Sequence, residues 1–158
     1  CGVGSWAASC IWYYLNKYGK NRPKIVIVEP TESCGVFQSF KENNRVSPKG
    51  SLNTIMAGLN CGIPSKNAWE IIKNGCDAVI KISDKEVKSA MRILYNPIKN
   101  DSKIVSGESG AAGLAGLIKV RHLQDFRNHI NLNNSSKILL FNTEGDTDAN
   151  SFQEIIKN

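Results

Sequence analysis

The sequence begins with Cys1-Gly2-Val3-Gly4-Ser5 and continues without a break into Trp6-Ala7-Ala8-Ser9-Cys10-Ile11-Trp12-Tyr13-Tyr14-Leu15. This pattern predicts a glycine-rich turn that leads directly into a helix over residues 6–18, with Gly19 as its C-cap. A helix start presents backbone N–H groups and the positive end of the helix dipole, and glycines let the backbone close around an anion. The turn is therefore a candidate phosphate-binding loop, although many turns before helices carry two glycines and bind nothing.

Composition limits the classes of protein to consider. The 158 residues are 41% hydrophobic and 22% charged, which predicts one globular domain with a real core. The net charge of +6 comes from scattered lysines and not from a basic stripe with interleaved aromatics, so we expect no nucleic-acid partner. No apolar run reaches membrane-spanning length, so we expect a soluble protein that does not enter a membrane. Because no start methionine, signal peptide or first strand precedes the turn, we also expect residues 1–158 to be a fragment or a processed product.

The five cysteines form no CxxC pair and have no histidines at zinc-site spacing. An odd number of widely spaced cysteines is typical of a reducing compartment, which predicts a cytoplasmic protein. Cys34 and Cys61 both fall in expected loops, which leaves a local redox pair open as an alternative.

The order of elements predicts an α/β fold with a mainly parallel sheet and helices on both of its faces. Strands are expected at three short apolar runs, 24–28, 78–82 and 137–141, of which the last is the clearest. Helices are expected at 33–43, 66–74, 111–117 and 122–130, and a further helix should begin at the capping box of Ser83 and Glu86 and end near Asn96.

In such folds ligands bind beyond the carboxyl ends of the strands. Polar residues follow the first and last expected strands, in Glu29-Pro30-Thr31-Glu32 and in Asn142-Thr143-Glu144-Gly145-Asp146-Thr147-Asp148. Glu108 lies at another glycine-flanked helix start, where it acts either as a first-turn acid stabilised by the helix dipole or as a carboxylate beside a bound ring or amine. The residues alone leave both interpretations open.

Two other functions compete at this stage. An N-terminal cysteine followed by Gly-Val resembles the start of the N-terminal-nucleophile amidohydrolases, in which Cys1 would attack and its amine would act as base. That class needs the cysteine on a β-strand, whereas a helix is expected here. A non-catalytic module that binds a phosphorylated ligand is the other alternative. His122 and His129 are expected at the surface of one helix, and Asp146 and Asp148 lack a calcium-loop pattern, so no metal is expected.

Four motifs, read in order, resemble the C-terminal half of the diaminopropionate ammonia-lyase family, whose members are pyridoxal-phosphate enzymes of the tryptophan-synthase β fold type (fold type II). The motifs are Gly2-Val3-Gly4-Ser5, Thr54-Ile55-Met56-Ala57-Gly58-Leu59, Ser106-Gly107-Glu108-Ser109-Gly110-Ala111 and Thr143-Glu144-Gly145-Asp146-Thr147-Asp148. The resemblance covers essentially the whole chain.

The resemblance implies a role for each motif. Cofactor-binding residues would be Gly2, Val3, Gly4 and Ser5 for the phosphate, Glu108 beside the cofactor, and Asn142 or Thr143 against the pyridine nitrogen. Substrate-binding residues would be Thr54, Met56, Ala57 and Gly58. The implied reaction is the α,β-elimination of 2,3-diaminopropionate to pyruvate and ammonia.

The resemblance also implies what the chain lacks. The Schiff-base lysine and the catalytic base belong to the N-terminal half of such enzymes, so no catalytic residue is assigned to these 158 residues. The expected partners are that missing half, an amino-acid substrate and a second copy in a homodimer. The chain alone is expected to be inactive.

Overall fold

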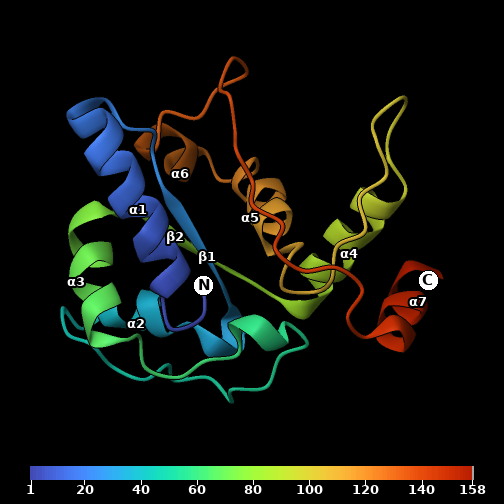
Figure 1. Ribbon diagram of the computed structural model, residues 1–158, viewed down its shortest axis with the longest axis horizontal. Coiled ribbons are helices and arrows are strands. Elements are labelled where there is room, and N and C mark those ends of the chain that lie inside the picture. The colour runs from blue at the N-terminus through green and yellow to red at the C-terminus, as the bar shows by residue number, and fades with distance from the viewer. Residues whose placement is uncertain (158) are drawn as a thin grey trace. The chain divides into compact units, whose positions relative to one another are not determined.

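In a computed structural model, residues 1–157 are described and form two compact units. The first contains Cys1–Thr54 and Gly58–Lys81, and the second contains Ile55–Ala57 together with the described residues from Ile82 onward. Figure 1 follows the chain through both units from its blue N-terminus to its red C-terminus.

The first unit is built on two helices and a small sheet. Helix α1 (Ser5–Tyr18) packs along α3 (Lys66–Gly75), and strands β1 (Val26–Pro30) and β2 (Ala78–Ile82) pair into a two-stranded parallel sheet. Helix α2 (Gly35–Lys41) follows β1. Short 3₁₀ turns complete the unit at Gly19–Asn21 and Thr31–Ser33, and a third, Ala57–Leu59, spans the unit boundary. The α/β fold class predicted from the sequence is confirmed.

Close packing of α1 on α3 gives the first unit its core. Ile11 and Ile72 are fully buried between the helices, beside Ala8, Ala68 and Trp69. A Cβ at Gly75 would overlap Ile11 Cγ2, so only glycine allows this approach. The predicted end of α1 is confirmed, because Gly19 has φ 53° and its N–H donates to the carbonyl of Leu15.

The two strands lie close to their predicted places. Strand β2 has the predicted bounds, whereas β1 begins at Val26 rather than at residue 24. The two residues before β1 both bind Asp77 instead: its carboxylate accepts a hydrogen bond from Ile25 N at 2.8 Å and forms an ion pair with Lys24 at 3.0 Å. This side chain holds the start of one strand against the start of the other.

The second unit is helical in the part that the structure describes. It contains α4 (Asp84–Tyr95), α5 (Ala112–Val120), α6 (Gln124–His129) and α7 (Ala149–Lys157), and α4 packs on both α5 and α7. The predicted capping box is confirmed: Ser83 Oγ accepts from Glu86 N at 3.3 Å, and Glu86 Oε2 accepts from Ser83 N at 2.6 Å. The α4–α7 contact includes an edge-to-face pair of Tyr95 and Phe152, whose ring centroids lie 5.5 Å apart.

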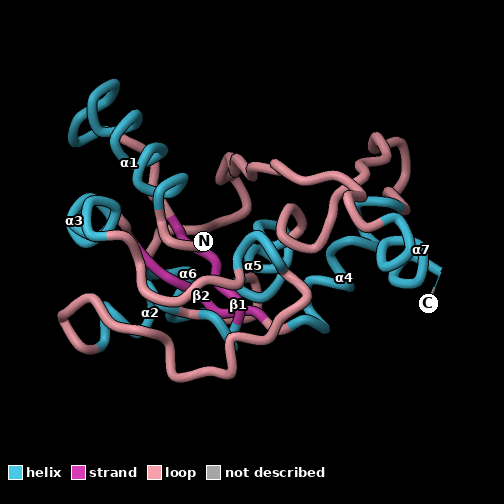
Figure 2. The backbone as a smooth tube through the Cα atoms, turned by 60° about the horizontal axis from the view of Figure 1, so that its bottom comes forward, coloured by secondary structure: helices cyan, strands magenta, loops and turns pink. Residues whose placement is uncertain are grey.

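The strand predicted at 137–141 is wrong. These residues belong to the long connection between α6 and α7, drawn as loop in Figure 2. Their apolar side chains are exposed, to 63% for Leu139. A run of β-formers becomes a strand only where a neighbour completes its hydrogen bonds, and no described strand of this unit pairs with it.

Helix α7 was not predicted. Its start is marked by Asp148, which accepts hydrogen bonds from Ser151 N through Oδ1 at 3.0 Å and from Phe152 N through its carbonyl at 2.9 Å. An aspartate followed by Phe152 and Ile155 on one face is a sequence signal that could have found this helix.

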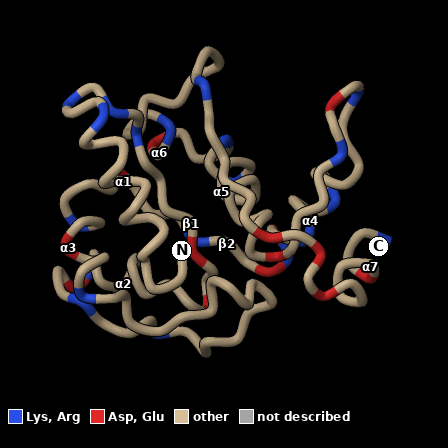
Figure 3. The backbone as a smooth tube through the Cα atoms, in the orientation of Figure 1, with Lys and Arg blue, Asp and Glu red and all other residues tan. Residues whose placement is uncertain are grey.

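Charge and hydropathy in the structure follow the sequence. Figure 3 shows Lys and Arg on elements of both units, in agreement with the scattered positive charge. None of the helices described between residues 1 and 157 has the length and apolar character needed to cross a membrane.

Candidate functional site

The turn formed by Gly2–Ser5 is closely surrounded, and its glycines are required. Gly4 occupies the cap position of α1 with φ 96°, a conformation that other residues adopt only with strain. A Cβ on Gly4 would lie 2.7 Å from Ile72 Cδ1, and a Cβ on Gly2 would lie 3.0 Å from Cys61 Sγ. The backbone of the turn therefore lies directly against its neighbours.

This turn has the properties of an anion-binding helix start. Helix α1 is 14 residues long, and its first turn contains no acidic residue. Since the cap residue is a glycine, it has no side chain to bind the first N–H groups of the helix. The turn is also tied to the start of α3, because Ser65 N donates to Val3 O at 2.8 Å. Such a helix start favours a negatively charged group, and the binding of a phosphate here stays a prediction.

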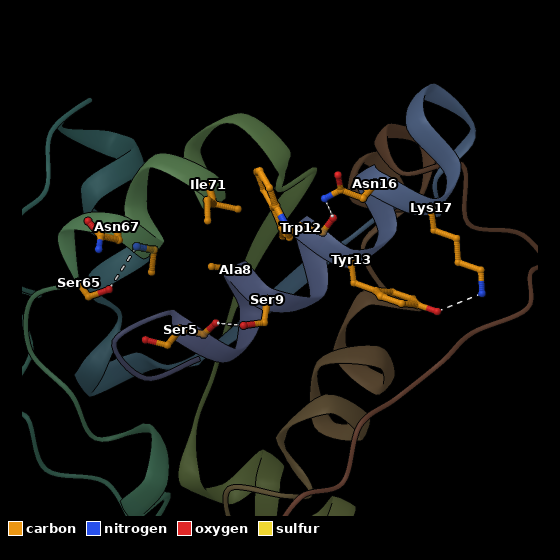
Figure 4. A pocket seen from close by; sticks show the side chains of 11 residues that line it. Ser5, Ala8, Ser9, Trp12, Tyr13, Asn16, Lys17, Ser65, Asn67 and Ile71 are labelled. Carbon is orange, nitrogen blue, oxygen red and sulfur yellow. Dashed lines mark hydrogen bonds between the residues drawn. The ribbon is translucent and has the colours of Figure 1, made fainter.

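An open groove of about 920 Å³ runs along α1 and α3 beside this turn. Figure 4 shows Ser5 and Ser65 at one end and Asn16 and Lys17 at the other, with Lys17 Nζ donating to Tyr13 Oη at 3.0 Å. Of the predicted site residues, Ser5 lines this groove.

The loop predicted to contact substrate spans the boundary of the two units. Thr54 and Gly58 belong to the first unit, and Met56 and Ala57 to the second. Met56 is fully buried, Thr54 is half-buried, and Ala57 and Gly58 are exposed. Their contact with substrate stays a prediction.

In the second unit, a turn at 106–111 leads into α5 and carries Glu108. Glu108 is 9% exposed, and its Oε1 accepts a hydrogen bond from Ser151 Oγ of α7 at 2.7 Å. The sequence predicted either of two roles for Glu108 but gave no sign of this hydrogen bond with Ser151. The place of Glu108 beside a cofactor stays a prediction.

Asn142 lies against the same turn. Its Oδ1 accepts a hydrogen bond from Ser106 Oγ at 3.1 Å, and its Nδ2 donates to Val105 O at 3.4 Å. The side chain of the neighbouring Thr143 is exposed. The structure thus brings Asn142 and Thr143 close to the turn of Glu108, although the strand expected before them does not form.

Glu29 is a buried acid whose environment the sequence analysis missed. It is completely buried at the end of β1, and its two carboxyl oxygens accept from Val36 N at 3.0 Å and Phe37 N at 2.8 Å, in the first turn of α2. Burial raises the pKa of this carboxyl to about 7, and the two N–H donors oppose the rise. A glutamate that ends an apolar strand shortly before a glycine-started helix is the signal that could have found it.

The structure also shows where the cysteines and the possible metal ligands lie. Cys1 precedes α1 and belongs to no strand, contrary to what an N-terminal-nucleophile enzyme requires. All five cysteines are free, so Cys34 and Cys61 form no disulfide; the Cys34 thiol donates to Thr31 O at 3.3 Å. Over residues 1–157, no three His, Cys, Asp or Glu side chains gather as metal ligands would.

The chain is similar in sequence to proteins of known function. The chain is 36% identical to the diaminopropionate ammonia-lyase of Escherichia coli K12 over 98% of its length, and 36% identical to that of Salmonella typhimurium over 99%. It spans 40% of the length of each of these relatives.

Solved structures show the same relationship. Diaminopropionate ammonia lyase from Escherichia coli, in complex with a reaction intermediate, matches with a TM-score of 0.88 and 35% identity over 99% of this chain and 40% of that one. Maize serine racemase matches with a TM-score of 0.80 and 23% identity over 99% of this chain and 44% of that one, a likeness of fold.

Residues 1–143 match the family described as pyridoxal-phosphate dependent enzymes, and this range includes the turns before α1 and α5 and both Asn142 and Thr143. The fold type II architecture predicted from the sequence is confirmed by these matches. The chain belongs to the family of pyridoxal-phosphate-dependent enzymes.

Proposed function

We propose that these residues supply the phosphate site and part of the ring pocket of a lyase that eliminates ammonia from 2,3-diaminopropionate. The observation that carries the proposal is the 36% identity to diaminopropionate ammonia-lyases over almost the entire chain. The proposal concerns the whole protein, of which the chain corresponds to 40% of the relatives' length.

The turn before α1 fits the phosphate of pyridoxal phosphate. Gly2 and Gly4 let the backbone of the turn lie directly against Cys61 and Ile72, and this packing holds the turn at the start of α1. The dipole of a 14-residue helix favours a negative group at this end, and no acidic residue of the first turn opposes it. Gly2, Val3, Gly4 and Ser5 would hold the phosphate through backbone N–H groups and the Ser5 hydroxyl.

Asn142 and Thr143 would provide the partner of the pyridine nitrogen. Both side chains are neutral, so neither would keep that nitrogen protonated. When bound, the cofactor supplies the electron sink for removal of the Cα proton. A weak sink suits an elimination, in which the leaving group departs from Cβ and no long-lived carbanion is needed. Glu108 would lie beside the ring, and Thr54, Met56, Ala57 and Gly58 would line the substrate side.

The lysine that binds the cofactor and the base that removes the Cα proton would come from another part of the protein. None of the lysines of this chain lies in a motif expected of that residue. For this reason the proposal is tested on the full-length protein and not on residues 1–158 alone.

The test is purification of the full-length protein, followed by absorbance spectroscopy and assays of pyruvate and ammonia. We expect a bound pyridoxal-phosphate band and pyruvate formation from 2,3-diaminopropionate that is faster than pyruvate formation from serine and faster than 2-oxobutyrate formation from threonine. A protein without that band would contradict the proposal, and so would a preference for serine. The amidohydrolase alternative predicts a different result. In that case the protein would hydrolyse glutamine, and a residue added in front of Cys1 to block its amine would abolish this activity.

A further inference from the structure

Glu144 binds the backbone of the turn that precedes α5. Its Oε2 accepts hydrogen bonds from Ser109 N at 2.6 Å and from Gly110 N at 3.1 Å. The backbone carbonyl oxygen of Glu144 also accepts a hydrogen bond, from Gly107 N at 3.1 Å. The side chain and the backbone of Glu144 therefore bind three N–H groups on either side of Glu108, those of Gly107, Ser109 and Gly110.

Two glycines make this contact geometrically feasible. A Cβ on Gly107 would lie 2.8 Å from Glu144 Oε2, and a Cβ on Gly110 would lie 2.8 Å from Glu144 O and would overlap Asn142 Oδ1. Any larger residue at either position would push the 142–145 segment away. The glycines flanking Glu108 thus serve this approach, which the sequence did not reveal.

The segment is fixed on both sides of Thr143. On one side, Asn142 Oδ1 accepts from Ser106 Oγ; on the other, Glu144 binds Ser109 and Gly110. Thr143 has an exposed side chain between these two anchors. The charge of Glu144 also lies at the N-terminal end of α5, where the helix dipole stabilises a carboxylate.

We propose that Glu144 is a positioning residue that holds Asn142 and Thr143 against the 106–111 turn and so fixes the group that faces the pyridine ring. This inference rests on the proposed function, because that function gives Asn142 and Thr143 their role. Glu144 itself touches neither substrate nor cofactor in the proposal. It acts through the backbone of the segment that it anchors.

Three variants of the full-length protein separate positioning from general stability. Glu144→Ala removes the acceptor, whereas Glu144→Gln keeps a side-chain oxygen at the same reach and removes the charge. Glu70→Gln is the matched control, since Glu70 is an exposed carboxylate of α3 in the first unit.

The first measurement is amide hydrogen exchange of the protein without cofactor, which reads the contact directly. In Glu144→Ala, the amides of Ser109 and Gly110 should exchange at least about tenfold faster, because hydrogen bonds to a charged acceptor are among the stronger ones. Glu144→Gln should lie nearer to the parent, and Glu70→Gln should match it. Unchanged exchange at Ser109 and Gly110 in Glu144→Ala would overturn the proposal.

The second measurement is the absorbance and fluorescence spectrum of the bound pyridoxal phosphate. Glu144→Ala should retain cofactor but shift its band, and Glu144→Gln should restore most of the parent spectrum. If Glu144→Ala shows faster amide exchange at Ser109 and Gly110 but an unchanged cofactor spectrum, Glu144 has only a structural role and the positioning proposal is overturned. A parent protein that binds no pyridoxal phosphate would instead contradict the proposed function, and the exchange measurement would still decide whether the contact exists.

Discussion

Two glycine turns of this protein lead into helices, and they differ in what satisfies the helix start. The turn Gly2–Ser5 precedes α1, whose first turn contains no acidic residue and whose cap is a glycine. The turn at 106–111 precedes α5, and there Glu144 of the same chain binds the N–H groups of Ser109 and Gly110. One helix start is suited to a negative ligand, and the other is already matched to an internal carboxylate.

The difference shows that a pair of glycines marks close approach and not the identity of what approaches. Gly4 lies against the apolar side chains of Ile72 and Ala68 of α3. Gly110 lies against polar atoms of Asn142 and Glu144. A methyl group added at Gly4 should therefore disturb the packing on α3, whereas one added at Gly110 should disturb the hydrogen bonds of Asn142 and Glu144. The two turns can thus be tested separately.

Gly110→Ala should have the largest effect. The new Cβ would overlap Asn142 Oδ1 and crowd Ser106 Oγ at 2.7 Å, so the 142–145 segment must move and the bonds of Glu144 are lost. Overpacking together with charged hydrogen bonds predicts a loss of about 5 kcal/mol in the free energy of unfolding. Urea unfolding of the full-length protein measures it.

The matched control for that variant is Gly113→Ala, one turn further along in α5. A Cβ there meets nothing closer than Leu140 at 3.7 Å. Alanine favours a helix over glycine by about 1 kcal/mol, so this variant should be as stable as the parent or more so. Equal losses from both variants would mean that α5 tolerates no Cβ on this side and that the Asn142–Glu144 contact is not special.

Gly4→Ala should have a somewhat smaller effect on stability but a direct effect on cofactor binding. The positive φ and the 2.7 Å approach to Ile72 predict a loss of about 4 kcal/mol. The dissociation constant of pyridoxal phosphate, measured by the fluorescence of the bound cofactor, should rise, because the N–H groups of the turn are displaced. Gly62→Ala is the control, since nothing lies within 4 Å of a Cβ there. Unchanged cofactor affinity in Gly4→Ala would remove the turn from the phosphate site.

Local signals in the sequence were sufficient for much of the fold. The C-cap at Gly19 and the capping box of Ser83 and Glu86 depend on residues within one helix turn, and both are present as predicted. Strand β2 was found from its apolar run. Motif order was sufficient for the family, since the glycine turn before α1 and the residues near 142 lie within the matched range.

Features that depend on distant partners were not predictable. The apolar run at 137–141 looks like a strand locally, but strands require a neighbour that no pattern within the run supplies. Glu144 was seen only as a member of a polar cluster, because its partners lie 34 and 35 residues earlier in the chain. Its role followed from hydrogen bonds that only the fold creates.

Glu29 binds a third helix start, that of α2, and its raised pKa makes this contact sensitive to pH. Like Glu144, it accepts hydrogen bonds from two backbone N–H groups, but those of Val36 and Phe37 lie in the first turn of α2, and Glu29 is completely buried. Burial raises its pKa to about 7 from an ordinary value of 4.5. A raised pKa means that the folded state holds the proton more tightly than the unfolded state does.

The stability of the protein should therefore fall as pH rises from 4.5 to 7. Below this window the carboxyl is protonated in both states, within it the unfolded state loses its proton first, and above it the loss is complete, at about 3 kcal/mol. Urea unfolding across this range should show the decline in the parent and not in Glu29→Gln. Glu32→Gln is the control of opposite sign, since hydrogen bonds from Ser51 lower the pKa of Glu32 and its contribution to stability is lost toward acid pH. If the parent and Glu29→Gln have parallel pH profiles, the two N–H donors of α2 outweigh burial, and the pKa of Glu29 is not raised.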